Sequence, residues 1–254
     1  MLNNLFAKLI YGPIIFLSLF FLNSCSDDEV KIIMVATSLN EVVDQEYMHS
    51  KQKDDFFINY GGSLSLARRV ENNQKKIGAV IFASNTSIEI LINKQIIDES
   101  SIKLLAKNSL VLATKKNNRT YEDFLGTIHK NNKEKIVIAD KNIAPAGKYS
   151  QQVLDQLFSE EIQKRKVISS GDISYVSNLL IYNENYYGII YKTEAIKNDL
   201  EVLYEFPSTL HDDIEYKLGI LNNNNNLSIN NFIDRLTSDR VLNNLSELGF
   251  KIEK

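Results

Sequence analysis

Two short segments of the chain combine glycine with uncharged hydrogen-bond donors in a pattern suited to anion binding. In residues 56–68, an apolar strand-like run ends at Gly61 and Gly62, and Ser63 opens a helical pattern. Residues 145–147 (Pro-Ala-Gly) form a second turn that leads into a helical pattern. Glycine allows backbone to approach a ligand closely, and the first turn of a helix offers unpaired N–H groups at the positive end of its dipole. Such a site can hold a dianion without a buried lysine or arginine.

The first of these segments also permits a catalytic interpretation. Residues 61–65 (Gly-Gly-Ser-Leu-Ser) have the strand, turn and helix context of the nucleophile elbow of α/β-hydrolases, with Ser65 in place of the last glycine. A catalytic triad would need a histidine, and only His211 follows the serine at a suitable distance within a loop. Because His211 is followed by two aspartates, it reads more simply as part of a polar turn. The sequence therefore favours binding over catalysis.

The elements around the two segments alternate between strand and helix. Apolar runs predict short strands, helical periodicity predicts the elements between them, and Thr37 or Ser38 is the expected N-cap of the first helix. This order indicates parallel sheets covered by helices on both faces. The predicted strands are 31–36, 55–60, 79–83, 110–114, 135–139, 188–191, 202–206 and 215–221; the predicted helices are 39–48, 64–72, 87–93, 148–157, 173–183, 229–236 and 241–248.

These elements fall into two α/β groups with no long linker between them. We expect lobe 1 to contain residues 31–109 and 208–254 and lobe 2 to contain residues 110–207, so that the chain crosses between the lobes twice. In open α/β sheets, ligands bind beyond the carboxyl ends of the strands. A ligand is therefore expected in a cleft between the two lobes.

The amino terminus has the layout of a lipoprotein signal peptide. One positive charge, Lys8, precedes an apolar run over residues 9–22, and residues 22–25 (Leu-Asn-Ser-Cys) resemble a lipobox. Cleavage would remove residues 1–24, leaving a lipid anchor on Cys25 and a tether over residues 25–30. The alternative is an uncleaved membrane anchor, although the run is shorter than the roughly 20 residues of a membrane span. Both interpretations place the rest of the chain outside the cytoplasm.

Composition excludes several other classes of site. Cys25 is the single cysteine, which rules out an intrachain disulfide, a cysteine-built zinc site or an iron–sulfur cluster. The formal net charge is −3 and the lysines are scattered, so nucleic acid is not an expected partner.

At this point the chain resembles the molybdate-binding proteins of ATP-binding-cassette importers, which have the two-lobed, type II periplasmic solute-binding protein fold. The resemblance covers nearly the whole mature chain, because its motifs occur in family order. The matching motifs are residues 36–39, 62–68, 108–111, 145–149, 188–191 and 248–250. The chain departs from the family pattern at residues 78–80, which replace Pro-Ala-Asp, and near residues 85–86, where an acidic residue is usual.

The resemblance implies a specific set of ligand contacts. Ser38 and Ser63 match serines that contact the anion, Ala146 and Ile173 match residues that donate backbone N–H groups, and Tyr191 matches a tyrosine whose hydroxyl reaches it. It further implies an α/β receptor with two mixed or parallel sheets, which works as a monomer without a cofactor or catalytic residues. Such a receptor passes molybdate or tungstate to a membrane permease, and the molybdenum is bound as an oxyanion rather than through side-chain ligands.

The chemistry of these contacts agrees with such a ligand and leaves alternatives open. Molybdate and tungstate carry no proton at neutral pH, so they need only donors, which hydroxyl and amide groups supply. A protonated phosphate would need an acceptor, whereas sulfate is not excluded. Ser38 and Ser63 could instead be helix caps and Tyr191 a core residue. A lipoprotein that acts as a sensor or adhesin is a further possibility.

Overall fold

The computed structural model describes residues 30–51, 54–142 and 144–253. The predicted signal peptide and Cys25 lie outside the described residues. From Lys31 onward the chain forms one compact unit. No helix within the described residues is both long enough and apolar enough to cross a membrane.

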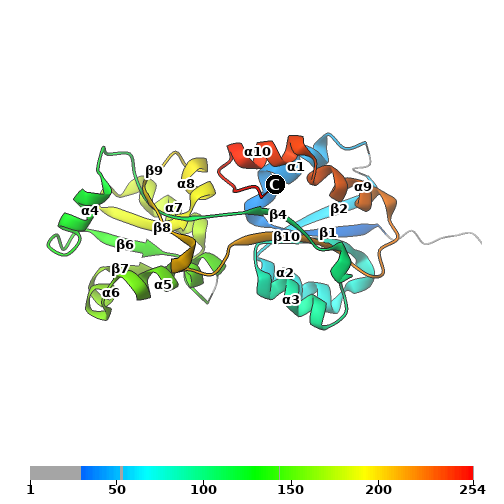
Figure 1. Ribbon diagram of the computed structural model, residues 1–254, viewed down its shortest axis with the longest axis horizontal. Coiled ribbons are helices and arrows are strands. Elements are labelled where there is room, and N and C mark those ends of the chain that lie inside the picture. Colours follow the sequence, from blue (N-terminus) through cyan, green and yellow to red (C-terminus); the bar gives the residue numbers. More distant parts are fainter. Residues whose placement is uncertain (1–29, 52–53, 143, 254) are drawn as a thin grey trace, which may run out of the picture. The chain divides into compact units, whose positions relative to one another are not determined.

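The first sheet has five strands in the order β2-β1-β3-β10-β4 (Figure 1). Strands β1, β2 and β3 run parallel, whereas β10 is antiparallel to both β3 and β4. All six residues of β3 are buried, as expected for a strand covered on both faces. The strands are β1 Lys31–Ala36, β2 Phe56–Gly61, β3 Ile77–Phe82, β4 Lys103–Lys107 and β10 Glu215–Ile220.

Helices cover both faces of this sheet. Helices α1, α9 and α10 lie on one face, and α2 and α3 lie on the other (Figure 1). The apolar sides of α2 and α3 pack with Met34 and Val80 of the sheet in one hydrophobic cluster. The helices are α1 Asn40–Met48, α2 Ser63–Asn72, α3 Asn85–Asn93, α9 Leu227–Leu236 and α10 Asp239–Glu247.

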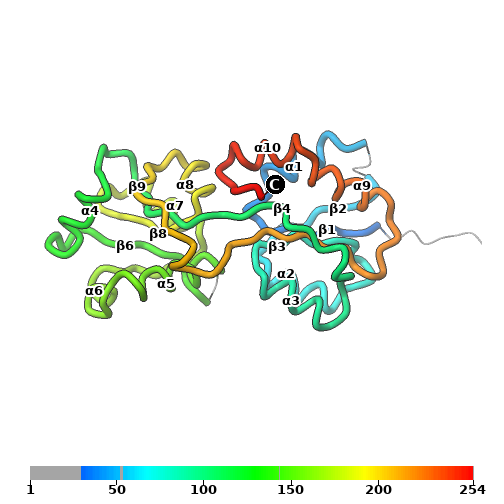
Figure 2. The backbone as a smooth tube through the Cα atoms, in the orientation of Figure 1, coloured from blue at the N-terminus to red at the C-terminus, as the bar shows by residue number. Residues whose placement is uncertain are grey.

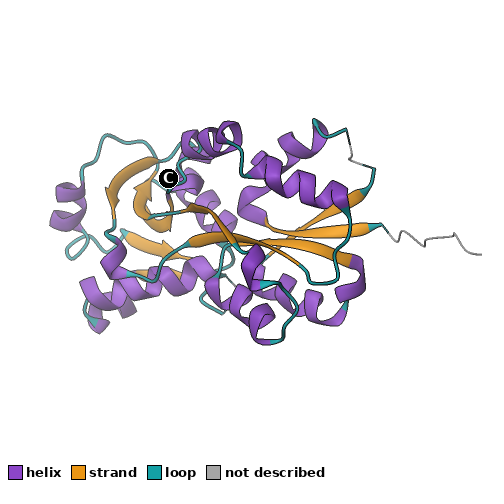
Figure 3. Ribbon diagram, turned by 45° about the vertical axis from the view of Figure 1, so that its right-hand side comes forward, coloured by secondary structure: helices purple, strands orange, loops and turns teal. Residues whose placement is uncertain are grey.

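The second sheet also has five strands, in the order β7-β6-β8-β5-β9. Strand β6 is parallel to β7 and β8, and β5 is antiparallel to β8 and β9. Helices again surround the sheet (Figure 3). The elements are β5 Leu110–Thr114, α4 Tyr121–Thr127, β6 Lys135–Ile138, α5 Pro145–Leu157, α6 Glu160–Lys166, β7 Val167–Ser169, α7 Ile173–Tyr182, β8 Tyr186–Tyr191, α8 Lys192–Lys197 and β9 Glu201–Glu205.

The chain passes between the sheets twice (Figure 2). It leaves the first sheet between β4 and β5 and returns between β9 and β10. The two connecting segments lie side by side, because the N–H of Asn108 in one donates to the carbonyl of Ile214 in the other at 2.9 Å.

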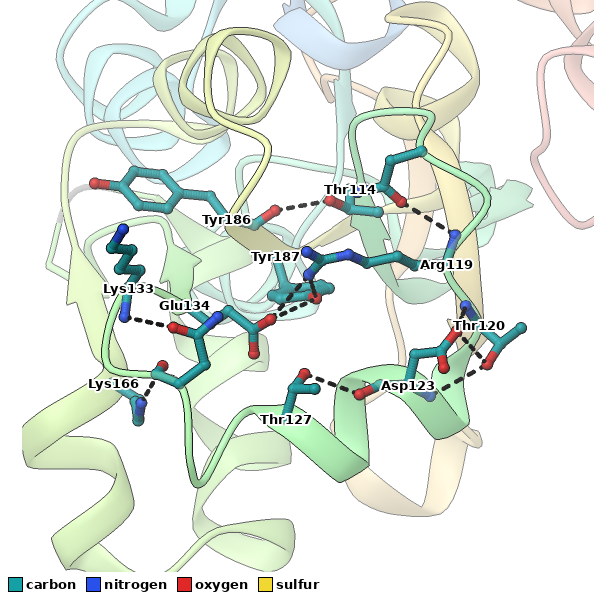
Figure 4. A network of polar contacts seen from close by, with 12 residues as sticks. Thr114, Arg119, Thr120, Asp123, Thr127, Lys133, Glu134, Lys166, Tyr186 and Tyr187 are labelled. Carbon is teal, nitrogen blue, oxygen red and sulfur yellow. Dashed lines mark hydrogen bonds and ion pairs between the residues drawn. The ribbon is translucent and has the colours of Figure 1, made fainter.

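A buried polar network fixes the end of the second sheet where β6 begins (Figure 4). The Arg119 guanidinium donates to Glu134 Oε1 at 2.9 Å and also to the Tyr187 hydroxyl. Lys166 is almost fully buried, and its Nζ donates to the carbonyl of Asn131 at 2.8 Å. Buried charged groups are stable when they are paired or hydrogen-bonded in this way.

The sequence-based expectation missed β4, α4, α6, β7 and α8, and it also placed two helix starts wrongly. The N-cap of α1 is Leu39, without a side-chain capping bond, because Thr37 and Ser38 belong to a separate 3-10 turn. The expected N-cap role of Thr37 or Ser38 is therefore wrong. Helix α5 begins at Pro145 rather than at Lys148, since proline fits the first helical position, where its missing N–H is not needed.

Candidate functional site

Ser38 and Ser63 both lie just beyond the carboxyl edge of the first sheet. Strands β1 and β2 pair in parallel up to Ala36 and Gly61, which are partners in the register. Ser38 and Ser63 each follow two residues later. The register therefore places both serines at one edge of the sheet, where ligands of α/β proteins bind.

Ser63 is the first residue of α2, and Gly62 is the N-cap. The interpretation of Ser63 as a helix cap is therefore wrong. Its side chain is 3% exposed, and its Oγ accepts the backbone N–H of Ala83 at 3.0 Å. A hydroxyl has one proton to donate and can accept through its oxygen. Because the oxygen is already engaged, the Ser63 proton is available to a ligand that accepts hydrogen bonds.

Ser38 is exposed and lies near a buried tyrosine. Burial raises the pKa of Tyr216 on β10, which is 0% exposed, and the nearby Ser38 and Asn108 side chains partly offset this rise. Ser38 also lines a small pocket together with Thr193 of α8 and Phe250 near the carboxyl terminus. This pocket brings residues from the helices and loops of both sheets to the vicinity of Ser38.

The other three candidates follow the parallel strands of the second sheet. Ala146 is the second residue of α5, after β6; Ile173 is the first residue of α7, after β7; Tyr191 is the last residue of β8. Strand β6 lies between β7 and β8 and is parallel to both. All three therefore emerge at the carboxyl edge of these strands. The backbone N–H groups of Ala146 and Ile173 are among the first-turn donors that lack an intrahelical partner.

The turn before α5 depends on Gly147. A Cβ atom at this position would lie 2.3 Å from the carbonyl oxygen of Ala139 and 2.6 Å from backbone atoms of Asp140 and Lys141. The first turn of α5 thus packs directly against the end of β6, which fixes the position of the Ala146 N–H. The N–H of Asp140 donates to the carbonyl of Gly171 at 2.9 Å and joins this loop to the one before α7.

Ile173 has a different environment from the other candidates. Asp172 is the N-cap of α7, and its Oδ1 accepts the N–H of Tyr175 at 3.0 Å. The carboxylate of Asp172 therefore already accepts one of the first-turn N–H groups of α7. Within the described residues no side-chain hydrogen bond joins Ile173 to Ser38, Ser63 or Tyr191, although Ile173 packs against the hydrophobic cluster that includes Tyr191.

Three buried tyrosines, Tyr149, Tyr191 and Tyr216, affect one another's pKa values and lie near candidates from both sheets. Burial, with smaller effects of Tyr216 and Tyr149, raises the pKa of Tyr191 well above its ordinary value. Burial likewise raises the pKa of Tyr149 to about 12, with Asp212 and Tyr216 adding to the effect. Tyr149 lies on α5, one turn beyond Ala146, and the Ser38 side chain is one of the groups that lower the pKa of Tyr216. These hydroxyls remain protonated at neutral pH and can donate hydrogen bonds.

The tyrosines Tyr149 and Tyr216 were not among the residues predicted from sequence. The helical spacing between Ala146 and Tyr149 is a signal that could have found the first of them. Tyr216 lies in β10, where it stands between two charged residues, and nothing in the sequence near it points to Ser38.

The carboxylates near the tyrosine cluster are paired with lysines. Lys148 Nζ lies 3.4 Å from Asp212 Oδ2, and the Glu215 carboxylate contacts both Lys107 and Lys217 at 3.3 and 2.7 Å. Within the described part of the chain, no group of three or more His, Cys, Asp or Glu side chains could hold a metal ion. The cluster is therefore better suited to an anion that accepts hydrogen bonds than to a cation.

The geometry gives no support to a triad of Ser63 and His211. Nδ1 of His211 lies 2.8 Å from the carbonyl oxygen of Asp212, and its ring contacts that of Tyr149. The Oγ of Ser63 is bonded to Ala83 instead. No contact between the described residues joins the serine to the histidine.

Comparisons with known proteins agree with this geometry. A family model described as bacterial extracellular solute-binding protein matches residues 33–251. The molybdate-binding protein ModA of Escherichia coli is 25% identical over 239 residues, which cover 91% of this chain and 92% of that protein. YvgL of Bacillus subtilis, whose provisional name describes an ABC transporter substrate-binding lipoprotein, is 24% identical over 91% of this chain and 90% of its own length.

A solved structure is similar over nearly the same range. A substrate-binding domain from Clostridium difficile, provisionally assigned to a molybdenum ABC transporter, has a TM-score of 0.73 at 23% identity. The match covers 88% of this chain and 99% of that one. The similarity confirms the predicted two-lobed α/β fold.

Proposed function

Because the chain belongs to the family of bacterial extracellular solute-binding proteins, we propose that it is the receptor that captures molybdate or tungstate for an ABC importer. The family consists of binding proteins rather than enzymes, so the hydrolase interpretation of Ser63 and His211 is not retained. The lobes that we propose are residues 31–109 with 208–254 and residues 110–207, with the anion bound between them.

The proposed site uses uncharged donors. Ser38, Ser63 and Tyr191 would donate from their hydroxyls, and Ala146 and Ile173 from their backbone N–H groups. The observation that supports this most directly is the bond from Ala83 to the Ser63 Oγ, which leaves the buried Ser63 hydroxyl as a donor. The raised pKa of Tyr191 has the same consequence, since its hydroxyl stays protonated.

A donor-only site suits a fully deprotonated tetrahedral dianion. Hydrogen phosphate carries a proton that needs an acceptor, and none of the five proposed groups is a carboxylate. Hydrogen bonds to charged groups contribute about 1.5 to 3 kcal/mol each, so five of them supply about 7 to 15 kcal/mol. A micromolar Kd corresponds to about 8 kcal/mol. Submicromolar binding is therefore within reach even after the free-energy cost of ordering the site is subtracted.

Sulfate is the second candidate ligand, because it has the same charge and geometry as molybdate and also needs only donors. The choice between the two would depend on cavity size, since specificity is a difference between two affinities.

We further propose that the mature protein is a monomer held at the membrane by a lipid on Cys25. Support comes from the lipobox-like residues 22–25 and from the name of the Bacillus subtilis relative. Metabolic labelling with a radioactive fatty acid tests this proposal, because the label should appear in the wild-type protein and be lost in Cys25→Ala.

Isothermal titration of the mature chain with molybdate, tungstate, sulfate and phosphate tests the ligand. We expect submicromolar binding of molybdate and tungstate, binding of sulfate at least about 100-fold weaker, and no binding of phosphate. If sulfate bound as tightly as molybdate, the protein would be a sulfate receptor. A folded protein that bound none of the four anions would favour the sensor or adhesin alternative.

A further inference from the structure

We infer that Gln152 is a positioning residue for the closure of the two lobes around the anion. It holds the return connection between β9 and β10 (residues 206–214) against α5, so that bending between the lobes is confined to Asp213 and Ile214. The inference rests on the proposed function, because closure on a bound anion is the event that Gln152 assists. Gln152 itself does not need to touch the ligand.

The return connection runs beside α5 and is fastened to it by two glutamines (Figure 2). Gln152 makes two hydrogen bonds to Asp212: its Oε1 accepts the backbone N–H at 2.9 Å, and its Nε2 donates to Oδ2 at 2.9 Å. One turn further along α5, Gln156 Nε2 donates to the carbonyl of Leu210 at 2.9 Å. Residues four apart share a face of a helix, so one face of α5 holds the connection.

The fastened part of the return connection belongs with the second sheet. At its start, the N–H of Phe206 donates to the carbonyl of Leu110 on β5 at 2.9 Å. At its other end, β10 pairs with β3 and β4 of the first sheet. Only Asp213 and Ile214 lie between the contacts of Gln152 and the start of β10. The boundary between the lobes in this connection therefore lies at residue 213 rather than at residue 208.

The outgoing connection, from β4 to β5, bends at the same level. Lys107 ends β4, and the carbonyl of Ser109 accepts the N–H of Lys192 on α8 at 2.9 Å, so Asn108 is the residue between the two sheets. The N–H of Asn108 donates to the carbonyl of Ile214 at 2.9 Å. The two bending points are therefore neighbours, as expected of a hinge, which consists of a few loop or element-terminal residues.

The helix that fastens the return connection also carries a proposed ligand contact. Ala146 lies in the first turn of α5, and Gln152 lies further along the same helix. A shift of α5 toward the anion therefore carries the fastened connection with it. Without the Gln152 contacts, the connection gains conformational freedom in the open state, and closure has to remove that freedom again. Loss of Gln152 should thus weaken binding although no contact to the ligand is lost.

Titration of Gln152→Ala and Gln151→Ala with molybdate tests the inference. The two glutamines are adjacent in α5, both are half-buried, and each takes part in two side-chain hydrogen bonds of 2.7 to 2.9 Å. Gln151, however, bonds to Asp155 and Gln163, within the second lobe. Gln152→Ala should weaken molybdate binding about fivefold, and Gln151→Ala should change it less than about twofold. Both variants should lower the melting temperature by similar amounts.

An exchange of the two side-chain types provides a rescue experiment. The double variant Gln152→Glu/Asp212→Asn keeps one carboxylate and one amide in contact but reverses their positions. The carboxylate at position 152 can accept both the backbone N–H and the side-chain amide of residue 212. We expect this double variant to bind molybdate within about twofold of the wild type, because the effects of contacting residues are not additive.

Gln156→Ala provides a further measurement if Gln152→Ala does not fold. The side chain of Gln156 is exposed, and its loss removes the bond to Leu210. This variant should weaken molybdate binding about threefold.

The outcomes distinguish the inference from the proposed function. Equal molybdate affinities of Gln152→Ala and Gln151→Ala would overturn the inference and leave the proposed function intact. An exchange variant that bound as weakly as Gln152→Ala would do the same, since the loss would then not come from this pair of bonds. A wild-type protein that bound neither molybdate nor tungstate would overturn the proposed function and the inference with it.

Discussion

The Oγ atom of Ser63 accepts the backbone N–H of Ala83 at 3.0 Å, which joins the first turn of α2 to the end of β3. Both groups are buried, so the bond does two things at once. It satisfies a backbone donor that would otherwise be unpaired, and it leaves the serine proton for a ligand.

The first prediction concerns Ser63→Ala. This variant should bind molybdate at least about tenfold more weakly, because one charge-assisted hydrogen bond is lost. It should also unfold with a free energy lower by about 1 to 3 kcal/mol, because the N–H of Ala83 loses its partner. Titration calorimetry and urea unfolding measure the two effects. Ser65→Ala, an exposed change in the same helix, should alter neither; unchanged affinity in Ser63→Ala would remove Ser63 from the site.

The second prediction compares two helical glycines, Gly147 in the first turn of α5 and Gly126 in α4. At Gly147 a Cβ would lie 2.3 Å from the backbone oxygen of Ala139, whereas nothing lies within 4 Å of a Cβ at Gly126 in α4. Gly147→Ala should therefore lower the free energy of unfolding by at least about 2 kcal/mol. Gly126→Ala should raise it by about 0.5 to 1 kcal/mol through helix propensity. Urea unfolding of both variants tests this, and equal stabilities would contradict the close packing of the turn.

The third prediction concerns pH. Burial raises the pKa of Tyr149 to about 12 and that of Tyr191 well above its ordinary value. Since a tyrosine is neutral below its pKa, both hydroxyls should remain donors throughout the range from pH 7 to pH 9. Molybdate affinity, measured by calorimetry at constant ionic strength, should therefore change less than about twofold over this range. A steady loss of affinity toward pH 9 would indicate that a phenolate forms in the site.

The strand ends that carry the proposed site could be located from the sequence because they depend on local patterns. The apolar runs of β1 and β5 define their own boundaries, and the glycine turn before Ser63 marks the start of α2. Strand β7, with three residues, is too short to show a period. The antiparallel place of β10 between β3 and β4 depends on pairing between distant segments, which local periodicity does not encode.

The same distinction separates the proposed site residues from those that sequence reasoning missed. Ser38 and Ser63 each follow a strand and precede a helix, a local signal. Ser38 and Tyr216 are far apart in the chain, and their proximity becomes visible only when β10 is placed in the first sheet. The side-chain amide of Asn108 likewise donates to Thr193 on the second sheet's side and to Tyr216 on the first, contacts that local sequence cannot show.

The fourth prediction concerns acid stability and Glu205, at the end of β9. Its carboxylate contacts Lys251 at 2.7 Å and Lys192 at 2.8 Å, and its side chain is 32% exposed. Burial alone would raise the pKa of Glu205, but the hydrogen bonds from the two lysines outweigh it and bring the pKa to about 2. A carboxyl whose pKa is lower in the folded state stabilises the fold above its unfolded pKa, here about 4.5, and loses this contribution as the pH falls toward 2.

Glu205→Gln should therefore destabilise the protein at pH 7 and do so much less at pH 3. The pKa difference corresponds to about 3 kcal/mol, and partial exposure reduces the expected effect at pH 7 to about 1 to 2 kcal/mol. Glu160→Gln is the control, because Glu160 pairs with Lys164 while 88% exposed and should contribute at most about 0.5 kcal/mol. Urea unfolding at both pH values measures the difference. If Glu205→Gln were equally destabilising at pH 7 and pH 3, the carboxylate would not owe its effect to these two lysines.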